Sequence, residues 1–461
     1  MSRLQGSSSR SGQRQKPWSK GGTEATPVLP PGLPARIAAA AILADVVGSG
    51  RPLDEYFTSD PVHGRLVGLD ARDRALVRSI ATASLRRLGT IRKALGGFLD
   101  RGMPKKSGSL EWTLVVTAAQ LLFLDVPDHA AVNLCVQAVR LDPQSQPYAA
   151  LANAVARNLA RERETLVDTD PLLDLPQWML ARWRQTYGAE GVQRIATAIR
   201  TEPRLDVTVR DDPQGWAERL DGEVLSTGSL RLRNQAPVRE LPGYEDGRWW
   251  VQDAAAALPA RLLRAEWGER IADLCAAPGG KTAQLAAAGA QVVAVDRSAE
   301  RLKRLAGNLE RLSLSAETVV ADAAAYEAPV FDAVLLDAPC SATGTMRRHP
   351  DVGWTKRLSD VGTLAALQAR MLDRAIALLR PGGRLVYCVC SIEPEEGEAQ
   401  IAALTRRNPD VLRDPVGADE VAGHADWLTD KGELRTLPYF SPGAGHEGMD
   451  GFFAARLIRR A

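Results

Sequence analysis

Two cysteines, Cys340 and Cys390, stand where their thiols could act on the same substrate. Each follows a short, mainly apolar run typical of a strand buried on both faces, Phe331 to Leu336 and Leu385 to Val389. In open α/β sheets, ligands bind beyond the carboxyl ends of the strands. If the two strands are neighbours, which places them about 4.8 Å apart, both sulfur atoms can reach one bound ring. Because a thiolate is a good nucleophile, the pair predicts covalent catalysis.

Asp337 ends the first of these strands and is a third candidate for the catalytic site. A carboxyl group at that point could hydrogen-bond to a substrate and exchange a proton with it. Cys388 adds one more thiol nearby, so a zinc site formed by Cys340, Cys388 and Cys390 has to be considered. No fourth ligand occurs at metal-binding spacing, and we therefore expect no metal.

A second set of residues has the pattern of a cofactor-binding turn. The segment from Asp273 to Thr282 is typical of a strand, a turn of small residues and the start of a helix. Small residues let a ligand approach the backbone, and the first turn of a helix offers free N–H groups. The candidate cofactor-binding residues of this turn are Cys275, Ala276, Ala277, Pro278, Gly279, Gly280 and Lys281.

Acidic residues at the ends of the following strands complete the candidate cofactor site. Asp296 comes 21 residues after Cys275 and ends the next strand, a spacing suited to a ribose diol. Asp322 follows the third strand, where a carboxylate can accept a hydrogen bond from an adenine amino group. Asp337 is the remaining acid that we expect to face the cofactor.

Three kinds of ligand compete for this turn. A phosphate-binding P-loop would also end in Gly-Lys-Thr, as at residues 280–282, but it requires glycine where Cys275 stands. A dinucleotide site requires the pattern G-x-G-x-x-G, which this segment lacks. S-adenosylmethionine has one ribose and no phosphate, so it fits these residues best.

A regular alternation of strands and helices must position both sets of residues. Strands are expected at 270–274, 291–295, 318–320, 331–336 and 385–389, and helices at 281–288, 299–312, 364–379 and 395–407. This order predicts βαβ units and an α/β domain with a doubly wound parallel sheet over residues 251–461. A late strand at 451–457 is expected to close the sheet.

The residues before this domain divide into three parts. We expect a disordered basic tail at 1–33, an all-α domain at 34–165 and a small mixed α/β linking module at 166–250. The tail is rich in Ser, Gly, Gln and Pro, whereas the all-α part repeats apolar residues at helical spacing. Between Arg72 and Lys93 the chain carries seven Lys or Arg against one acid, a pattern that RNA contact and an ordinary solvated surface explain about equally well.

The composition excludes several classes of protein. With 45% hydrophobic and 25% charged residues over 461 positions, the chain reads as soluble and globular. No apolar run reaches the roughly 18 residues of a membrane span and no signal-peptide pattern is present, so we expect a cytoplasmic location. Five cysteines are too few for a disulfide scaffold and fit a reducing compartment. Cys135 and Cys275 are most simply small buried hydrophobic residues.

The motifs at Cys275–Lys281, Asp337–Ser341 and Tyr387–Glu396 resemble those of the Sun (nucleolar-protein-like) family of RNA cytosine-5 methyltransferases. The resemblance extends over Arg347–Asp351 and Gly451–Phe453, and it is greatest for the bacterial members that modify 16S ribosomal RNA. It implies a class I methyltransferase domain of Rossmann-like fold, preceded by a helical, RNA-binding domain similar to the antitermination factor NusB. It also implies S-adenosylmethionine as the cofactor.

The resemblance further implies a role for each catalytic candidate. Cys390 would be the nucleophile that attacks C6 of cytosine, Cys340 would help to remove the C5 proton and release the product, and Asp337 would hydrogen-bond to the base. Spacing alone leaves the order of the thiols open, because DNA cytosine-5 methyltransferases attack with the Pro-Cys thiol, which here is Cys340. Val389 stands where the family usually has Thr, which removes a possible hydrogen bond near the nucleophile.

Other functions remain open at this point. An amino-group methyltransferase would carry Asp-Pro-Pro-Tyr or a similar motif at residues 337–340 and would need no thiol. A ribosome-assembly or antitermination factor could bind RNA with a silent methyltransferase fold, although the cysteines and the cofactor acids argue against silence. We expect RNA as the partner, ribosomal RNA before transfer RNA, with Arg347, Arg348 and His349 as candidates for backbone contacts. We also expect a monomer without membrane association.

Overall fold

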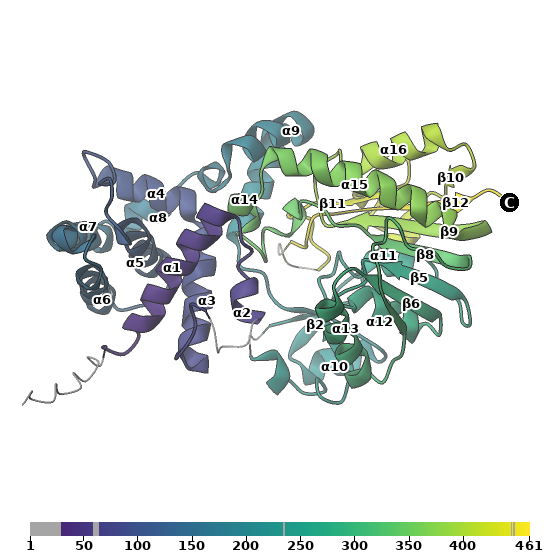
Figure 1. Ribbon diagram of the computed structural model, residues 1–461, viewed down its shortest axis with the longest axis horizontal. Coiled ribbons are helices and arrows are strands. Elements are labelled where there is room, and N and C mark those ends of the chain that lie inside the picture. Colours follow the sequence, from purple (N-terminus) through teal and green to yellow (C-terminus); the bar gives the residue numbers. More distant parts are fainter. Residues whose placement is uncertain (1–28, 59–63, 234–235, 444, 446–447) are drawn as a thin grey trace, which may run out of the picture.

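The computed structural model describes residues 29–58, 64–233, 236–443, 445 and 448–461. Most of the expected basic tail therefore lies outside the described residues. Figure 1 shows a group of helices at one end of the molecule and a sheet flanked by helices at the other. In the part of the chain that is described, no helix is both long enough and apolar enough to cross a membrane.

The all-α part is a bundle built around one apolar helix, α5. The helices are α1 (Leu33–Ser49), α2 (Glu55–Thr58), α3 (Ala71–Arg86), α4 (Leu88–Gly97), α5 (Leu110–Phe123), α6 (Asp128–Leu141), α7 (Ala149–Arg161) and α8 (Arg163–Val167), with a 3₁₀ turn at Gln146–Tyr148. Because α5 is apolar all round, it is buried along most of its length against α1, α3, α6 and α7. The expectation of an all-α part with apolar residues at helical spacing is thus confirmed.

The linking region combines a broken helix with a small antiparallel sheet. After a 3₁₀ turn at Pro171–Asp174, α9 spans Gln177–Arg200 and is interrupted at Gly188, whose φ of 71° is not helical. Gly188 thus divides α9 into two helical halves.

The strands of this small sheet are β1 (Asp206–Val209), β2 (Gly222–Val224), β3 (Leu230–Leu232) and β4 (Trp249–Val251), and they are accompanied by α10 (Pro213–Arg219) and a 3₁₀ turn at Val238–Glu240. Their order is β2-β3-β1-β4, with antiparallel pairing throughout. Trp249 and Trp250 are buried, so they are core residues and do not line a groove.

Eight strands form the main sheet of the α/β domain. They are β5 (Arg270–Leu274), β6 (Gln291–Asp296), β7 (Glu317–Val320), β8 (Phe331–Asp337), β9 (Leu379–Val389), β10 (Val411–Arg413), β11 (Leu434–Thr436) and β12 (Phe452–Arg459). The order is β10-β12-β9-β8-β5-β6-β7, and β11 also pairs with β12. Strands β5 to β9 are parallel, whereas the late strand β12 joins antiparallel to β9. The doubly wound fold is confirmed, with an antiparallel edge added to the parallel core.

Helices cover both faces of this sheet. On one face lie α11 (Leu258–Leu262), α12 (Gly280–Ala287) and α13 (Ala299–Arg311), and on the other lie α15 (Leu358–Ala377) and α16 (Glu398–Arg407). Short helical turns complete the domain at Thr343–Thr345, α14 (Val352–Thr355), Ala418–Val421 and Ala425–Trp427. α15 begins at Leu358, earlier than the expected residue 364, because the Asp360 carboxylate accepts a hydrogen bond from the Arg357 N–H at 2.8 Å and caps the first turn.

Candidate active site

The carboxyl ends of β8 and β9 bring the two cysteines together. β8 and β9 are adjacent parallel strands in which Asp337 is paired with Cys388. Beyond the strands, the sulfur atoms of Cys340 and Cys390 lie 3.5 Å apart, and both side chains are partly buried. The prediction that the two strands are neighbours is confirmed, and at this separation one flat ring can contact both sulfur atoms.

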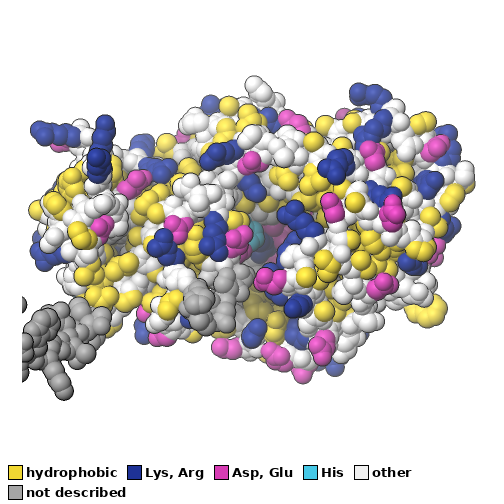
Figure 2. Space-filling model, viewed as in Figure 1, with side chains coloured by type: hydrophobic (Ala, Val, Ile, Leu, Met, Phe, Trp, Pro, Cys, Tyr) yellow, Lys and Arg dark blue, Asp and Glu magenta, His cyan; other side chains and the backbone are white. Residues whose placement is uncertain are grey.

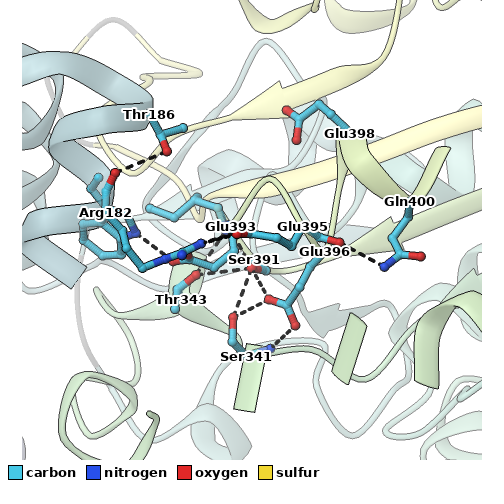
Figure 3. Close-up of polar contacts among 12 residues, drawn as sticks. Arg182, Thr186, Ser341, Thr343, Ser391, Glu393, Glu395, Glu396, Glu398 and Gln400 are labelled. Atoms are coloured by element: carbon cyan, nitrogen blue, oxygen red, sulfur yellow. Dashed lines mark hydrogen bonds and ion pairs between the residues drawn. The ribbon is translucent and has the colours of Figure 1, made fainter. Parts of the chain in front are cut away.

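A buried carboxylate, that of Glu396, holds the residues that directly follow the two cysteines (Figure 3). Its Oε1 accepts hydrogen bonds from the Ser341 N–H at 2.9 Å and from Gln368 Nε2 at 3.1 Å. Its Oε2 accepts hydrogen bonds from the hydroxyl of Ser391 at 2.5 Å and from the hydroxyl of Ser341. One side chain therefore ties together the two backbone segments that carry the thiols.

Helix α9 holds the loop after Cys390 from the other side (Figure 3). Arg182 forms ion pairs with Glu393 at 3.1 Å and with Glu395 at 2.6 Å. Trp183 Nε1 donates a hydrogen bond to Glu393 at 2.7 Å, and the nearby Tyr187 hydroxyl donates to a carbonyl of the same loop. Sequence reasoning gave neither α9 nor Glu396 a part in the site. The serine that follows each cysteine could have indicated such a residue, because two hydroxyl groups in buried loops need a hydrogen-bond acceptor.

The thiols differ in their surroundings. The pKa of Cys340 lies well above the usual thiol range, because it shares a hydrogen bond with Cys390 and because the group is buried. Burial also raises the pKa of Cys388 well above that range, of Cys275 to about 12 and of Cys135 to about 11. Cys135 is buried as expected, whereas Cys275 is partly exposed at the cofactor turn. Among the described residues, no group of three or more His, Cys, Asp or Glu side chains is arranged to hold a metal ion.

Asp337 connects the cysteine site to the cofactor turn. Its Oδ2 lies 2.8 Å from Nζ of Lys281, and its Oδ1 accepts a hydrogen bond from the Cys388 thiol at 3.5 Å. Burial lowers the pKa of Lys281, but the Asp337 carboxylate more than offsets this effect and leaves that pKa above its ordinary value. A charged ammonium group is thus held beside the catalytic edge.

Val389 does not lie on the same side of the sheet as Cys390. Side chains alternate along a strand, so Val389 packs into the apolar cluster beneath α15 and α16, whereas Cys388 and Cys390 face the cluster on the opposite side of the sheet. A threonine hydroxyl at this position would therefore point away from the nucleophile. The structure corrects the expectation that valine removes a hydrogen bond near that thiol.

The predicted cofactor turn has a backbone that requires small residues. Cys275 has a φ of 64° and Gly279 a φ of 105°. A Cβ on Gly279 would lie 2.8 Å from Cγ of Leu305, so glycine alone fits here without movement. Gly279 is also the N-cap of α12, whose first N–H groups have no partner within the helix.

The two acids predicted for the cofactor lie at the same edge of the sheet. Asp296 is buried, its Oδ2 accepts a hydrogen bond from the Ala277 N–H at 3.3 Å, and Nη1 of Arg301 lies 3.2 Å from the same oxygen. Asp322 is exposed just after β7. The preceding residue, Ala321, donates its N–H to the Asp296 carbonyl at 3.2 Å, which brings the two acids to one side of the turn.

Asp273, at the end of β5, is a further acid that sequence reasoning missed. Its Oδ2 accepts a hydrogen bond from the Thr282 hydroxyl at 2.6 Å, while its buried Oδ1 has no partner among the described residues. Burial raises the pKa of Asp273 to about 7. The free N–H groups of α12 suit the carboxylate of S-adenosylmethionine, and the acidic oxygens suit its ammonium and ribose hydroxyl groups. The residues present therefore fit this methyl donor.

The segment that follows Cys340 has many of its side chains engaged within the chain. Arg348 forms ion pairs with three buried acids, Asp206, Asp253 and Asp450. His349 Nδ1 lies 3.2 Å from an oxygen of Asp54 in the helical part, which raises the pKa of His349 against the effect of burial. Trp354 Nε1 donates to the carbonyl of Leu85 at 2.8 Å. These contacts join the helical and linking parts to the α/β domain, so Arg348 and His349 have partners other than RNA.

The basic residues between Arg72 and Lys93 do not form a single exposed face. Arg86 is buried and donates to the Arg347 carbonyl at 3.0 Å. Arg78 pairs with Asp54 at 2.9 Å. Part of the set thus serves packing between domains, and RNA contact by the remaining side chains stays a prediction.

Comparison with known sequences matches both parts of the chain. Residues 260–458 match the family model described as 16S rRNA methyltransferase RsmB/F, and residues 33–161 match that of the NusB family. The ribosomal RNA small subunit methyltransferase B of Salmonella arizonae is 34% identical over 445 residues, which cover 92% of this chain and 98% of that protein. The protein of the same name from Klebsiella pneumoniae is 35% identical over 445 residues, with the same coverage.

Solved structures show the same fold. A protein named PH0851 aligns with a TM-score of 0.69 at 22% identity and covers 94% of this chain and 100% of its own. A methyltransferase homologue from Pyrococcus horikoshii aligns with a TM-score of 0.53 at 27% identity and covers 63% of this chain and 98% of its own. From the family models and the relatives of nearly full length, we conclude that the chain belongs to the RsmB/F family of 16S ribosomal RNA methyltransferases, with a NusB domain before an S-adenosylmethionine-dependent methyltransferase domain.

Proposed function

We propose that this methyltransferase acts on carbon 5 of a cytosine in 16S ribosomal RNA, and that a cysteine bonds covalently to carbon 6 during the reaction. The observation that carries the proposal is the 3.5 Å separation of the Cys340 and Cys390 sulfur atoms at the ligand-binding edge of the sheet. An amino-group methyltransferase has no use for two adjacent thiols. In a methyltransferase fold without catalytic activity, nothing would require two thiols beside a complete set of cofactor acids.

Cys390 acts as the nucleophile. Carbon 5 of cytosine is a poor nucleophile by itself, but addition of a thiolate to carbon 6 turns the ring into an enamine and places electron density on carbon 5. Cys340 stays protonated because its pKa is raised, so its S–H can donate a hydrogen bond to the sulfur of Cys390. The assignment of Cys390 as the nucleophile rests on the family resemblance.

Cys340 acts in the second half of the reaction. After methylation, carbon 5 still carries its proton, and this proton must leave before the bond between Cys390 and carbon 6 can break. Cys340 contacts Cys390, so once its own thiol has lost its proton to solvent, its sulfur can take the proton from the adjacent ring carbon. Release of the thiolate then restores the aromatic ring.

Asp337 binds the base through N3 and the exocyclic amino group. Hydrogen bonding or protonation at N3 draws electrons from carbon 6 and makes addition of the thiolate easier. The bond to N3 requires Asp337 to carry a proton at that stage, while the Lys281 ammonium, 2.8 Å away, donates a hydrogen bond to the carboxyl group and holds it in place. When bound, S-adenosylmethionine supplies an electrophilic methyl group. Residues 275–281 with Asp296 and Asp322 would hold it, with Asp337 at the boundary between cofactor and base.

The substrate base must leave its stack to reach the two sulfur atoms. A loop or an incompletely assembled ribosomal RNA is therefore a better substrate than a regular helix. Figure 2 shows dark-blue Lys and Arg side chains, with magenta Asp and Glu among them, around a hollow between the helical part and the α/β domain. The basic side chains would attract an RNA strand there. Since one chain supplies both thiols and the cofactor residues, the protein acts as a monomer in the cytoplasm, where ribosomal RNA is assembled.

Two cysteine substitutions test the mechanism. The purified variants Cys340→Ala and Cys390→Ala are incubated with S-adenosylmethionine and 16S ribosomal RNA, and the products are separated on a denaturing protein gel. Cys340→Ala should accumulate a covalent protein–RNA adduct because release is blocked, whereas Cys390→Ala should form none. Cys135→Ala, which removes a buried thiol in the helical part, serves as the matched control. An adduct in Cys390→Ala and none in Cys340→Ala would reverse the two roles.

The substrate is tested separately. Bisulfite sequencing of RNA from cells with and without the protein should reveal one cytosine of 16S ribosomal RNA whose methylation depends on the protein. A dependent site in transfer RNA alone would replace ribosomal RNA as the substrate. Loss of a methyl group from an amino nitrogen, with no change at any cytosine carbon, would refute the proposed chemistry.

A further inference from the structure

A cavity lies between helix α9 and the segment before β12. Its volume is about 330 Å³. Its polar lining includes two arginines and several hydroxyl or amide groups, from Gln193, Arg194, Thr197, Arg347, Tyr439 and Ser441. Arg194 and Thr197 are exposed, so the cavity opens to solvent.

Arg347 forms the floor of this cavity and lacks the partners that a buried cation needs. The residue is 1% exposed, and its Nε and Nη1 are buried without a hydrogen-bond partner among the described residues. Burial lowers the pKa of Arg347. The carboxylates of Asp253 and Asp450 act on Arg347 electrostatically, but among the described residues no ion pair or hydrogen bond joins them to it, whereas the neighbouring Arg348 forms ion pairs with both and with Asp206. A buried guanidinium group with unsatisfied N–H groups is costly. Its presence beside a cavity therefore points to a ligand that accepts hydrogen bonds from it.

The other groups of the cavity identify the class of ligand. Arg194 stacks on the Tyr439 ring with its guanidinium carbon 3.9 Å from the ring centroid, which holds a second positive charge at the rim. Two guanidinium groups with nearby hydroxyl donors suit a tetrahedral oxyanion, and arginine binds phosphate oxygens through paired N–H donors. Building on the function proposed above, we propose that this cavity binds a phosphodiester group of the substrate RNA.

The position of the cavity explains what such a contact would do. The Gly344 N–H donates to the carbonyl of Cys390 at 3.1 Å, so the turn that leads to Arg347 is anchored on the catalytic loop. On the other side, Arg86 fixes the Arg347 carbonyl at 3.0 Å. A phosphate held here would set the position of the strand next to the unstacked cytosine.

Two substitutions and one control test the proposal in the full chain. Arg347→Met replaces the unpaired cation with an apolar chain of similar length, and Arg194→Gln removes the exposed charge at the rim. The control, Arg406→Met, removes an exposed arginine of α16. Binding of 16S ribosomal RNA is measured by filter retention from about 50 to 200 mM KCl, together with thermal unfolding and with transfer of labelled methyl groups.

Arg347→Met should raise the Kd for RNA about tenfold and lower the slope of log K against log salt by about 0.7 to 0.9, the value of one lost phosphate contact. Arg194→Gln should act in the same direction with a smaller effect, and Arg406→Met should change neither quantity. The melting temperature of Arg347→Met should stay the same or rise, because the variant no longer buries an unpaired charge.

Three results would overturn the inference: an unchanged Kd, an unchanged salt slope, or a clear fall in the melting temperature of Arg347→Met. The last would mean that the guanidinium group stabilises the fold without an anion. These outcomes are separable from the proposed function. If the wild type methylates cytosine and Arg347→Met binds RNA normally, the phosphate site is refuted and the function stands. If the salt slope of Arg347→Met falls as expected but the wild type methylates no cytosine carbon, the phosphate site stands and the proposed function is refuted.

Discussion

Substitution of Glu396 by glutamine should disable methyl transfer while leaving the cofactor site intact. All groups around this carboxylate are hydrogen-bond donors, the Ser341 N–H at 2.9 Å, Gln368 Nε2 at 3.1 Å and the hydroxyls of Ser341 and Ser391. Glutamine can present one oxygen to the first two donors, but its amide nitrogen then faces the hydroxyls. The oxygen of Ser391 already accepts the Glu393 N–H at 3.0 Å, so the new donor finds a poor acceptor.

The size of the effect follows from these contacts. A hydrogen bond to a charged group contributes about 1.5–3 kcal/mol and a neutral one about 0.5–1.5 kcal/mol, so four weakened bonds lower the free energy of unfolding by about 4–6 kcal/mol. The serines that lose this tether directly follow the two cysteines. Since a displacement of about 1 Å at reacting groups costs roughly 100-fold in rate, single-turnover methyl transfer should fall about 100-fold.

The assay compares Glu396→Gln with its neighbour Glu395→Gln. Glu395 forms an ion pair with Arg182 but its side chain is 47% exposed, so its substitution should cost at most about 1 kcal/mol and change the rate only a few-fold. Both variants should bind S-adenosylmethionine with wild-type affinity, because residues 275–281 make no contact with either glutamate. A wild-type rate in Glu396→Gln would refute the positioning role, and a parallel loss of cofactor affinity would show general damage instead.

Three further predictions concern the surroundings of the site. Asp273 has a pKa of about 7 in the folded protein, against about 3.9 in the unfolded chain, so the folded state holds an extra proton between these values. The free energy of unfolding should therefore fall with rising pH by roughly 1.4 kcal/mol per pH unit in that window and level off above it. In denaturant unfolding, Asp273→Asn should lack this pH dependence. Equal slopes of unfolding free energy against pH for the two proteins would contradict the assignment. Gly279→Ala should weaken binding of S-adenosylmethionine at least about tenfold, since the added carbon meets Leu305 and φ is 105°. Calorimetry measures this affinity. The control is Gly307→Ala in a helix, where the added carbon meets no atom within 4 Å, and this variant should bind normally. Arg182→Gln leaves the buried Glu393 without its ion-pair partner, so adduct formation should slow while RNA affinity is retained, and an unchanged rate would show that α9 does not position the loop.

Local sequence pattern was sufficient for the outline of the fold. The apolar runs at 270–274 and 331–336 became β5 and β8 with at most one residue of change, because strands buried on both faces need continuous apolar sequence. The small-residue turn after β5 could also be predicted from the sequence, since a positive φ and close packing allow few residue types there. The antiparallel placement of β12 could not be read in this way, because pairing direction depends on how a distant segment returns to the sheet.

For the candidate site, the sequence by itself determined which chemistry was available: two thiols and a carboxyl group at the ends of strands, and a turn suited to a methyl donor. Only the tertiary structure decided how these groups are held, through Glu396 bridging two serines, Arg182 reaching across from α9 and Lys281 pairing with Asp337. It also turned Val389 away from Cys390 and left Nε and Nη1 of Arg347 without a hydrogen-bond partner among the described residues. The physical reason is that residue type and strand period are local properties, whereas a hydrogen bond or an ion pair depends on which distant side chains the packed domains bring within reach.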